Sequence, residues 1–365
     1  MLNLVAGAGI TGLTVARKLA EGGEKVLVAE KLDVIGGNCR DLFDANGCYV
    51  QSCGPHIFHT ADPQVWAFLS RFTRWHPYRH RVLASVDGML LPLPFDARGL
   101  RMAFPEEYPL LRKKLQDYSG GKPVSVLELK GSKDPGIRRI GEYAYDRIYA
   151  NYTRKQWGVP PGELEPGVFD RVRIFPGEAD CYFPGEPFQG IPCGGYSALF
   201  REMAGHENIT LMLRTDYRHL KLSGPVRKII TGPIDEYYSY EHGPIAYRRI
   251  RLQCEEQMCP SYQENSVINY PNEHAYTRIT EYNKFLGLVK ERTVIGKEYP
   301  GAKDGFLAYP VPTKENRDVI AKYVEKAERE KDAYFAGRLA ECRYYDMDDA
   351  CRRGLDIAER ILCRA

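Results

Sequence analysis

The sequence has no Cys-x-x-Cys pair, no apolar run of membrane-spanning length and little net charge. Its ten cysteines also have no histidine partners at the spacing of a zinc site, so we expect reduced, mostly buried thiols and no metal. No apolar stretch reaches the roughly 18 residues of a membrane span, and the apolar start runs straight into a glycine motif, unlike a signal peptide. The formal charge of +3 is too small to indicate a nucleic-acid partner. Together these absences predict a cytoplasmic protein.

The composition that remains is that of an ordinary globular protein, with 44% hydrophobic and 27% charged residues. A chain of 365 residues can bury a sizeable core, and this length predicts two or three domains. The first thirty residues predict a strand at 2–6, a helix at 13–21 that stops at Gly22-Gly23, and a second strand at 25–29. This order is typical of the start of a nucleotide-binding α/β domain.

Three glycines lie between the first predicted strand and the helix. Gly7 allows a tight turn, Gly9 lets the backbone approach a pyrophosphate, and Gly12 permits close packing of helix and sheet. Glu30 follows Gly12 by 18 residues, close to the roughly 20 expected for the acid that binds a ribose hydroxyl. With the flanking strands, the pattern predicts a dinucleotide site at the N-terminus of the helix.

The segment Ile35-Gly36-Gly37-Asn38 narrows the choice of cofactor. This segment brings a second stretch of backbone, with little side-chain bulk, close to the predicted dinucleotide site. It resembles the second glycine motif of the flavoproteins related to amine oxidases and glutathione reductase. FAD is therefore favoured over NAD.

Later segments predict a hairpin and a helical insert, followed by a return to the nucleotide domain. We expect a hairpin at 82–93, helices within 105–157, a long functional loop at 160–192 and a helix capped by Ser197. After these we expect strands at 209–213 and 228–231 of the nucleotide domain and strands at 247–252 and 266–270 of a separate sheet. The chain is expected to end with a charged helix at 316–331, a strand at 333–336 and a final helix capped by Asp346.

Two aromatic or histidine-containing stretches are candidates for the ligand site. His56 and His59 follow Gly54-Pro55 and the cofactor motif, which favours a loop beside the flavin. Tyr152 and Trp157, with cations between them, could form a wall for a base or a sugar ring; the alternative is a helix end with two packed aromatic side chains.

These stretches closely resemble the bacterial UDP-galactopyranose mutases along nearly the whole chain. The resemblance is carried by Ile35-Gly36-Gly37-Asn38, His56-Ile57-Phe58-His59-Thr60, Tyr152-Thr153-Arg154-Lys155-Gln156-Trp157-Gly158, Gln189-Gly190-Ile191-Pro192, Tyr276-Thr277-Arg278-Ile279, Gly337-Arg338-Leu339-Ala340-Glu341 and Tyr344-Tyr345-Asp346-Met347. Because so many motifs follow the family order, the resemblance is not a chance match of one motif.

The resemblance implies an α/β fold with a discontinuous Rossmann-like FAD-binding domain, a helical insert domain and an antiparallel-sheet domain. The expected boundaries are 1–80, 191–240 and 316–365 for the FAD-binding domain, 81–190 for the helical domain and 241–315 for the antiparallel sheet. The implied activity is that of an isomerase. It interconverts UDP-galactopyranose and UDP-galactofuranose, for cell-wall or surface polysaccharide, without net redox change.

The resemblance also implies that FAD acts in its reduced form, with its N5 atom as the nucleophile, so an external reductant such as NAD(P)H is expected. The oligomeric state stays open, a homodimer included.

Residue roles follow from the motif positions. The implied catalytic residues are Arg171, Arg278 and His56, with both arginines on the UDP diphosphate and His56 against the flavin. The implied substrate-binding residues are His80, Tyr152, Trp157, Tyr182, Asn269, Tyr309, Tyr344 and Asp346. The implied cofactor-binding residues are Gly7, Gly9, Gly12, Glu30, Lys31, Gly37, Asn38, His56, Ile57, Asp216, Tyr217, Gly337, Arg338, Asp346 and Met347.

The sequence departs from the family pattern at several positions near the implied site. These are Pro55, His80, Ile148, Phe188 and a loop before Arg278 that is one residue short. The nucleotide sugar therefore stays open, and a related N-acetylated or deoxy hexose is an alternative. A flavin oxidoreductase of the amine-oxidase type would not need the arginines and tyrosines of a diphosphate site, and a non-catalytic nucleotide-sugar binder would not need the flavin motifs.

Overall fold

The computed structural model describes residues 1–363 and divides the chain into two compact units. The first unit comprises Met1–Pro77, Glu186–Arg248 and the chain from Phe306 onward. The second comprises Tyr78–Gly185 and Arg249–Gly305. Both units are therefore built from segments far apart in the sequence, whereas the finer division into helical and antiparallel-sheet domains stays a prediction.

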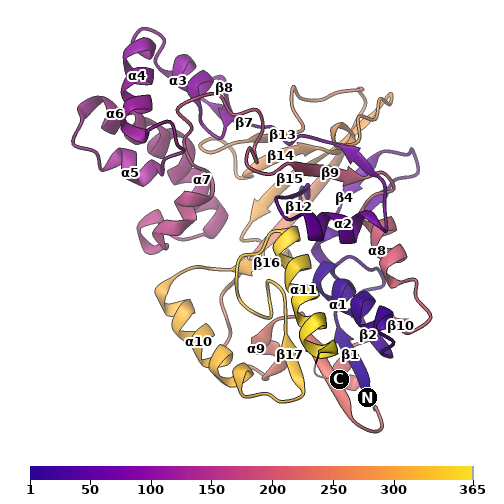
Figure 1. Ribbon diagram of the computed structural model, residues 1–365. Coiled ribbons are helices and arrows are strands. Elements are labelled where there is room, and N and C mark those ends of the chain that lie inside the picture. Colours follow the sequence, from indigo (N-terminus) through magenta and orange to yellow (C-terminus); the bar gives the residue numbers. More distant parts are fainter. Residues whose placement is uncertain (364–365) are drawn as a thin grey trace. The chain divides into compact units, whose positions relative to one another are not determined.

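The first unit contains a parallel sheet with helices on both faces (Figure 1). Its elements are β1 (Leu2–Ala6), α1 (Ile10–Glu21), β2 (Val26–Ala29), β3 (Asp41–Phe43), β4 (Tyr49–Gln51), β5 (Phe58–Thr60), α2 (Pro63–Ser70), β6 (Trp75–Pro77), β9 (Phe188–Pro192), α8 (Tyr196–Ala204), β10 (Ile209–Met212), β11 (Val226–Ile230), α9 (Ile234–Tyr237), β16 (Phe306–Pro310), α10 (Lys314–Glu328), β17 (Ala333–Phe335) and α11 (Met347–Leu362). The predicted Rossmann-like architecture is confirmed.

The strand order of the parallel sheet is β10-β2-β1-β11-β17. Asn3 in β1 lies opposite Val26 in β2 and Arg227 in β11, so the carboxyl ends of these strands reach the same edge. The predicted return of the chain to this sheet after residue 208 is confirmed. Helix α1 begins at Ile10, three residues earlier than predicted, because Gly9 is its N-cap.

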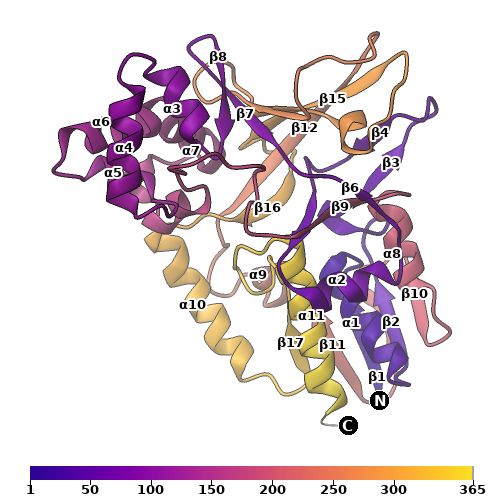
Figure 2. The same ribbon diagram turned by 45° about the horizontal axis from the view of Figure 1, so that its top comes forward.

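Side chains of successive residues in the central strands enter different apolar clusters, as strand geometry requires. Val5, Val28 and Ile229 pack with residues of α1, α8 and α11, whereas Ala6 and Ile230 pack with residues of α9 and α10. Figure 2 shows α1 and α11 together at the sheet. Burial on both faces holds the carboxyl edge of the sheet in place, and this edge carries the glycine motif.

A small antiparallel sheet corrects the prediction of one long loop at 160–192. Its order is β5-β9-β6, with Phe58 opposite Gly190 and Trp75 opposite Pro192. The strand at Phe188–Pro192 was missed because its Gly and Pro content indicates a loop. Its pairing partners are more than a hundred residues away in the sequence.

The cap of α8 is also different from the predicted one. The helix begins at Tyr196, so Ser197 is already inside it, and its hydroxyl donates to the Asp41 carbonyl at 2.8 Å. The buried Asp41 carboxylate accepts hydrogen bonds from Tyr196 N at 2.5 Å and Ser197 N at 2.7 Å. It also accepts one from the Tyr49 hydroxyl at 2.6 Å. A distant carboxylate, and not a local serine, therefore satisfies the first amides of this helix.

Asp41→Ala is expected to destabilise the protein by about 2 kcal/mol or more, because it removes a helix cap and leaves a buried tyrosine hydroxyl without its acceptor. The measurement is the free energy of unfolding by urea, with Asp117→Ala as control. Asp117 is exposed and paired with Lys113 one helical turn away, so its loss should change stability little. Equal losses for both variants would contradict the capping role of Asp41.

The second unit combines a cluster of helices with a mainly antiparallel sheet. Its elements are β7 (Val82–Val86), β8 (Met89–Leu93), α3 (Ala97–Ala103), α4 (Tyr108–Ser119), α5 (Val126–Lys130), α6 (Pro135–Ala144), a π-helical turn (Tyr145–Tyr149), α7 (Ala150–Trp157), β12 (Tyr247–Gln257), β13 (Val267–Asn269), β14 (Arg278–Glu281) and β15 (Thr293–Pro300). The predicted hairpin at 82–93, the helices within 105–157 and the separate sheet are confirmed.

The strands that the second unit contributes to this sheet run in the order β12-β15-β14-β13-β7-β8. Asn269 at the end of β13 lies opposite Arg278 at the start of β14, and Ile279 lies opposite Lys297 in β15. This register places Glu298 of β15 beside Arg278 on the other side. Three polar side chains from three adjacent strands therefore share one face.

In residues 1–363 no helix combines the length and the apolar character needed to cross a membrane. Of the ten cysteines, five are buried and two partly buried, while Cys193, Cys254 and Cys363 are exposed. The prediction of mostly buried thiols therefore holds for five of the ten, since two are partly buried and three are exposed.

Candidate functional site

The glycine motif forms a sharp turn from β1 into α1. Gly7 has φ +112°, a conformation that disfavours a side chain, and its amide donates to the Ala29 carbonyl at 2.8 Å. A Cβ atom at Gly12 would lie 2.0 Å from the Gly7 carbonyl oxygen and 3.1 Å from a Val5 methyl group. The turn thus requires glycine at both positions, as the sequence predicted for turn and helix packing.

Gly9 is different, because its own backbone is extended and would accept any residue. A Cβ atom there would have Gly37 Cα, at 3.8 Å, as its nearest neighbour among the described residues, which is ordinary contact. The absent side chain therefore leaves open space between two glycine backbones, directly at the N-terminus of α1. No side chain of the described residues caps this end of the helix, so its first amides are available to an anion.

Glu30 directly follows β2 at the same edge of the sheet, and its carboxylate is fixed by two backbone amides. Oε2 accepts from Ala8 N at 2.8 Å and Oε1 accepts from Leu32 N at 3.0 Å. Each carboxylate oxygen can accept more than one hydrogen bond. The oriented carboxylate can therefore still accept hydroxyl groups of a ribose.

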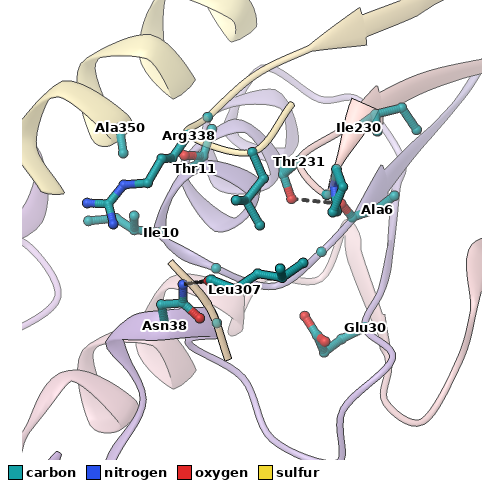
Figure 3. A pocket seen from close by; sticks show the side chains of 18 of the residues that line it. Ala6, Ile10, Thr11, Glu30, Asn38, Ile230, Thr231, Leu307, Arg338 and Ala350 are labelled. Carbon is teal, nitrogen blue, oxygen red and sulfur yellow. Dashed lines mark hydrogen bonds between the residues drawn. The ribbon is translucent and has the colours of Figure 1, made fainter. Parts of the chain in front are cut away.

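These residues line a cavity of about 450 Å³ in the first unit (Figure 3). Its volume is in the range of ligand pockets. The predicted cofactor residues that line it are Gly7, Gly9, Gly12, Glu30, Lys31, Gly37, Asn38, His56, Tyr217, Gly337, Arg338, Asp346 and Met347. Figure 3 shows Glu30 and Arg338 at opposite sides of the view, so the pocket can hold an elongated ligand. The remaining two, Ile57 and Asp216, directly adjoin His56 and Tyr217 in sequence.

The Glu30 side of the pocket carries a charged network. Lys31 Nζ lies 2.5 Å from Glu236 and 3.7 Å from Asp216, and Arg218 lies 2.5 Å from Asp216. The hydrogen bond from Arg218 holds the pKa of the Asp216 carboxyl well below its usual range. Asp216 is thus charged and tied to its neighbours, and its side chain orients Lys31 and Arg218.

The Arg338 side of the pocket is formed by segments near the C-terminus of the unit. Arg338 donates to the carbonyls of Tyr345 at 3.1 Å and Ala308 at 3.3 Å. Asp346, as predicted, caps α11 in a reciprocal pair in which its own amide donates to Asp349 at 3.1 Å. The first turn of α11 therefore faces the pocket with Asp346, Met347 and Ala350 among the lining residues.

His56 reaches this pocket on a loop whose backbone is held from both sides. Its amide donates to Gln51 Oε1 at 2.6 Å, and its carbonyl accepts from Gln51 Nε2 at 2.8 Å. The ring Nδ1 lies 3.0 Å from the Gly54 carbonyl. Gln51 thus fixes the position of a predicted flavin-side residue.

Several lining residues were missed by the sequence reasoning: Thr231, Glu236, Leu307 and Ala350. Thr231 follows β11 directly, and the rule that ligands bind at the carboxyl ends of parallel strands could have indicated it, because β11 ends beside β1. Leu307 had no signal in the sequence. Its carbonyl accepts a hydrogen bond from Asn38 Nδ2 at 2.7 Å (Figure 3). The Asn38 side-chain amide therefore fixes the segment of Leu307 at the pocket.

The second unit holds a separate cluster around Arg278. Its guanidinium donates through Nη2 to the Tyr152 hydroxyl, and Nε lies 3.5 Å from Glu298 Oε2. The Arg278 side chain is 24% exposed, whereas that of Glu298 is only 4% exposed. Burial raises the pKa of Tyr152, so it stays a neutral donor and acceptor. The partly exposed Arg278 guanidinium is therefore held between the Tyr152 hydroxyl and the buried Glu298 carboxyl group.

Asn269 adjoins this cluster from β13. It is the direct cross-strand partner of Arg278, and its Oδ1 atom is buried with no hydrogen-bond partner in the described part of the chain. A buried polar atom without a partner costs free energy unless a ligand or water satisfies it. The structure therefore brings three predicted residues together, namely Tyr152, Asn269 and Arg278.

The other predicted substrate residues of the second unit occupy neighbouring segments. Tyr182 N donates to the His80 carbonyl at 2.6 Å, and the two rings are 5.5 Å apart. Trp157 is the buried last residue of α7, and Arg171 ends a 3-10 turn at Pro166–Arg171.

Tyr309 and Tyr344 belong to the first unit, where their rings are 5.8 Å apart. The Arg338 guanidinium lies 4.9 Å from the Tyr344 ring centre. Of the predicted substrate residues, Tyr152 and Asn269 thus lie together with Arg278 in the second unit, while Tyr309 and Tyr344 pack together near Arg338 in the first.

Sequence and structure comparisons identify the family of the chain. The sequence model of the UDP-galactopyranose mutase family matches residues 147–344, and that of the NAD(P)-binding Rossmann-like domain matches residues 5–72. A probable UDP-galactopyranose mutase of Klebsiella pneumoniae is 32% identical over 369 residues, which cover 98% of this chain and 94% of the relative. A dTDP-fucopyranose mutase of Escherichia coli is 32% identical over 98% of this chain and 97% of the relative.

A solved structure, that of a reduced UDP-galactopyranose mutase, superimposes with a TM-score of 0.77 at 16% identity and covers 100% of this chain and 96% of the other. This likeness shows a shared fold. The family itself is shown by relatives at over 30% identity along nearly the full length. The chain therefore belongs to the UDP-galactopyranose mutase family of isomerases.

Proposed function

We propose that this protein interconverts UDP-galactopyranose and UDP-galactofuranose without net redox change, with FAD in its reduced form. The observation that carries the proposal is the Arg278 cluster, because an oxidoreductase of the same fold class would need the nucleotide pocket alone. A half-buried guanidinium beside Tyr152 and Asn269 matches the needs of a sugar diphosphate.

The residues of the first unit fit FAD. The open space beside Gly9 and the uncapped amides of α1 suit a pyrophosphate, and Glu30 suits a ribose diol. Lys31, Asn38, Ile57, Asp216, Tyr217, Gly337, Arg338 and Met347 would complete the cofactor site. When bound and reduced, FAD would supply through N5 the nucleophile that displaces UDP from the anomeric carbon. His56 and the first turn of α11, with Asp346, would orient the isoalloxazine ring.

The arginines would bind and stabilise the leaving group, UDP. As the bond from the anomeric carbon to UDP breaks, negative charge grows on the diphosphate, and a positioned guanidinium stabilises it. Arg278 is fixed by Tyr152 and Glu298 before any ligand binds, so little reorganisation is needed. Arg171 would bind the same diphosphate, and Tyr182, Tyr309 and Tyr344 would donate hydrogen bonds to it.

The remaining residues would position the nucleotide sugar. Asn269, with its unsatisfied Oδ1 atom, would accept a hydrogen bond from a sugar hydroxyl. Tyr152 and Trp157 would line the path of the uridine and the sugar, and His80 would lie near the sugar through its contact with Tyr182. Lys155 is not available for this role, because it donates to the carbonyls of Tyr270 at 2.7 Å and Glu273 at 2.8 Å.

A deoxy hexose is the second candidate for the sugar. It is favoured by the dTDP-fucopyranose mutase of E. coli, which is as similar in sequence as the K. pneumoniae relative. The test is to incubate the dithionite-reduced, flavin-loaded protein with UDP-galactofuranose, dTDP-fucofuranose or an N-acetylated analogue, and to separate the products by chromatography. We expect the pyranose isomer from UDP-galactofuranose. Conversion of dTDP-fucofuranose alone would assign the deoxy sugar, and oxidation of the sugar would overturn the isomerase mechanism.

A further inference from the structure

The Glu298 carboxyl group of the second unit is buried without full hydrogen bonding. Its Oε1 atom is buried and has no hydrogen-bond partner among residues 1–363. Its Oε2 atom lies 3.5 Å from Arg278 Nε, which is longer than a good hydrogen bond. The backbone is better satisfied, since the Glu298 carbonyl accepts from Thr277 N at 2.9 Å. The side chain therefore depends on one nearby cation for its charged state.

The groups that face Glu298 from the adjoining elements confirm this dependence. From β14 the facing group is the Arg278 guanidinium, and from α7 it is the neutral Tyr152. From β12 the residue opposite Glu298 is the apolar Leu252. Burial raises the pKa of Glu298 above its ordinary value, and Arg278 opposes this shift. Any loss of the attraction from Arg278 would therefore favour the protonated carboxyl.

A diphosphate bound at Arg278 would compete with Glu298 for the same guanidinium. It would also bring negative charge close to a carboxyl group in a site of low polarity, where like charges repel strongly. Both effects disfavour the carboxylate. Neither requires Glu298 to touch the ligand.

We propose that binding of a nucleoside diphosphate sugar at Arg278 is accompanied by uptake of one proton from solvent onto the Glu298 carboxylate. This inference rests on the proposed function, because it takes the diphosphate to bind Arg278. Glu298 is then a positioning residue that loses its negative charge when the ligand brings its own. Arg278 therefore has an anionic partner both in the free protein and in the complex. No bond to the ligand forms, and the proton comes from the buffer.

The sign of the pH dependence follows from linkage. Ligand binding raises the pKa of Glu298, so protons are taken up at pH values between the pKa of the free protein and that of the complex. In this range the affinity falls as pH rises, by at most about tenfold per pH unit for one proton. Since the free pKa is already raised, the range lies above that of an ordinary glutamate.

The test is calorimetric titration of the oxidised, flavin-loaded full chain with UDP-galactopyranose. The diphosphate of this ligand is a diester and carries no group that titrates near neutrality. Titrations at one pH in buffers of different ionisation enthalpy give the number of protons taken up, and repeating them at several pH values gives the affinity profile. We expect proton uptake and weakening affinity toward high pH.

Glu298→Gln should abolish the proton uptake and flatten the affinity profile, because the amide keeps the shape and has no proton to gain. Glu255→Gln is the matched control. Glu255 lies on β12 and is paired with Lys297 at 2.8 Å, so its variant should behave as the wild type. Should Glu298→Gln not fold, the buffer dependence of the wild type still decides the question.

Two results would overturn the inference: tight binding of UDP-galactopyranose without buffer dependence at any pH, or unchanged proton uptake in Glu298→Gln. Failure of the wild type to bind the ligand at all would instead overturn the proposed function. The two failures are therefore distinguishable in one set of titrations.

Discussion

Arg278→Ala is expected to lower turnover by on the order of 100-fold or more, since loss of one fixed donor to a developing anion costs about 3 kcal/mol. The loss should appear mainly in kcat, because the charge on the diphosphate increases as the anomeric bond breaks. The measurement is steady-state turnover of UDP-galactofuranose by the reduced protein. Thermal melting of each variant checks folding, because the change also removes the cation beside the buried Glu298.

Arg278→Lys should recover little of this loss. A lysine ammonium cannot reproduce the guanidinium geometry that joins Tyr152, Glu298 and a diphosphate. Arg138→Ala is the control, since Arg138 is half-exposed on α6 and lies 3.9 Å from Glu142. A lysine variant with near-normal turnover would show that net charge alone is needed, and equal effects of Arg278→Ala and Arg138→Ala would contradict the assigned role.

Gly9→Val is expected to yield a folded protein that has lost most of its flavin. The Gly9 backbone is extended, and a Cβ atom there would make only ordinary contact, 3.8 Å from Gly37 Cα, so folding should be preserved. The added side chain would fill the space that a pyrophosphate needs at the N-terminus of α1. The measurement is the ratio of flavin absorbance to protein after purification, together with the melting temperature of the apoprotein after addition of FAD.

Gly162→Val provides the control for this prediction. A Cβ atom at Gly162 would have no described atom within 4 Å, and the residue lies in the second unit, outside the nucleotide pocket. This variant should bind flavin as the wild type does. Full flavin content in Gly9→Val, or equal loss in both variants, would contradict the placement of the pyrophosphate.

The nucleotide pocket could be predicted because its determinants are local in sequence. The turn at Gly7, the packing at Gly12 and the acid at Glu30 all belong to one strand, helix and strand unit, and each needs a specific residue type. The same locality explains why Asp346 could be recognised as the cap of α11. Sites whose residues lie close together in the sequence could therefore be predicted from motifs.

Features made by distant segments could not be predicted in this way. The α8 cap comes from Asp41, 156 residues before Ser197, and competes with a serine that looks like a local cap. Strand β9 finds its partners near Phe58 and Trp75, and its Gly-Pro composition indicates a loop. Glu298 was missed for a related reason, because its sequence neighbourhood carries no signal and its place beside Arg278 depends on the pairing of β15 with β14.

The most direct test of the central claim is an anaerobic experiment with a protein reduced by a measured amount of dithionite. The substrate is UDP-galactofuranose in large excess over flavin, and both the pyranose product and the flavin absorbance spectrum are followed. We expect many turnovers per flavin with no reoxidation, and no turnover in the untreated oxidised protein. Equal turnover by the oxidised protein, or one product formed for each flavin reoxidised, would contradict this claim.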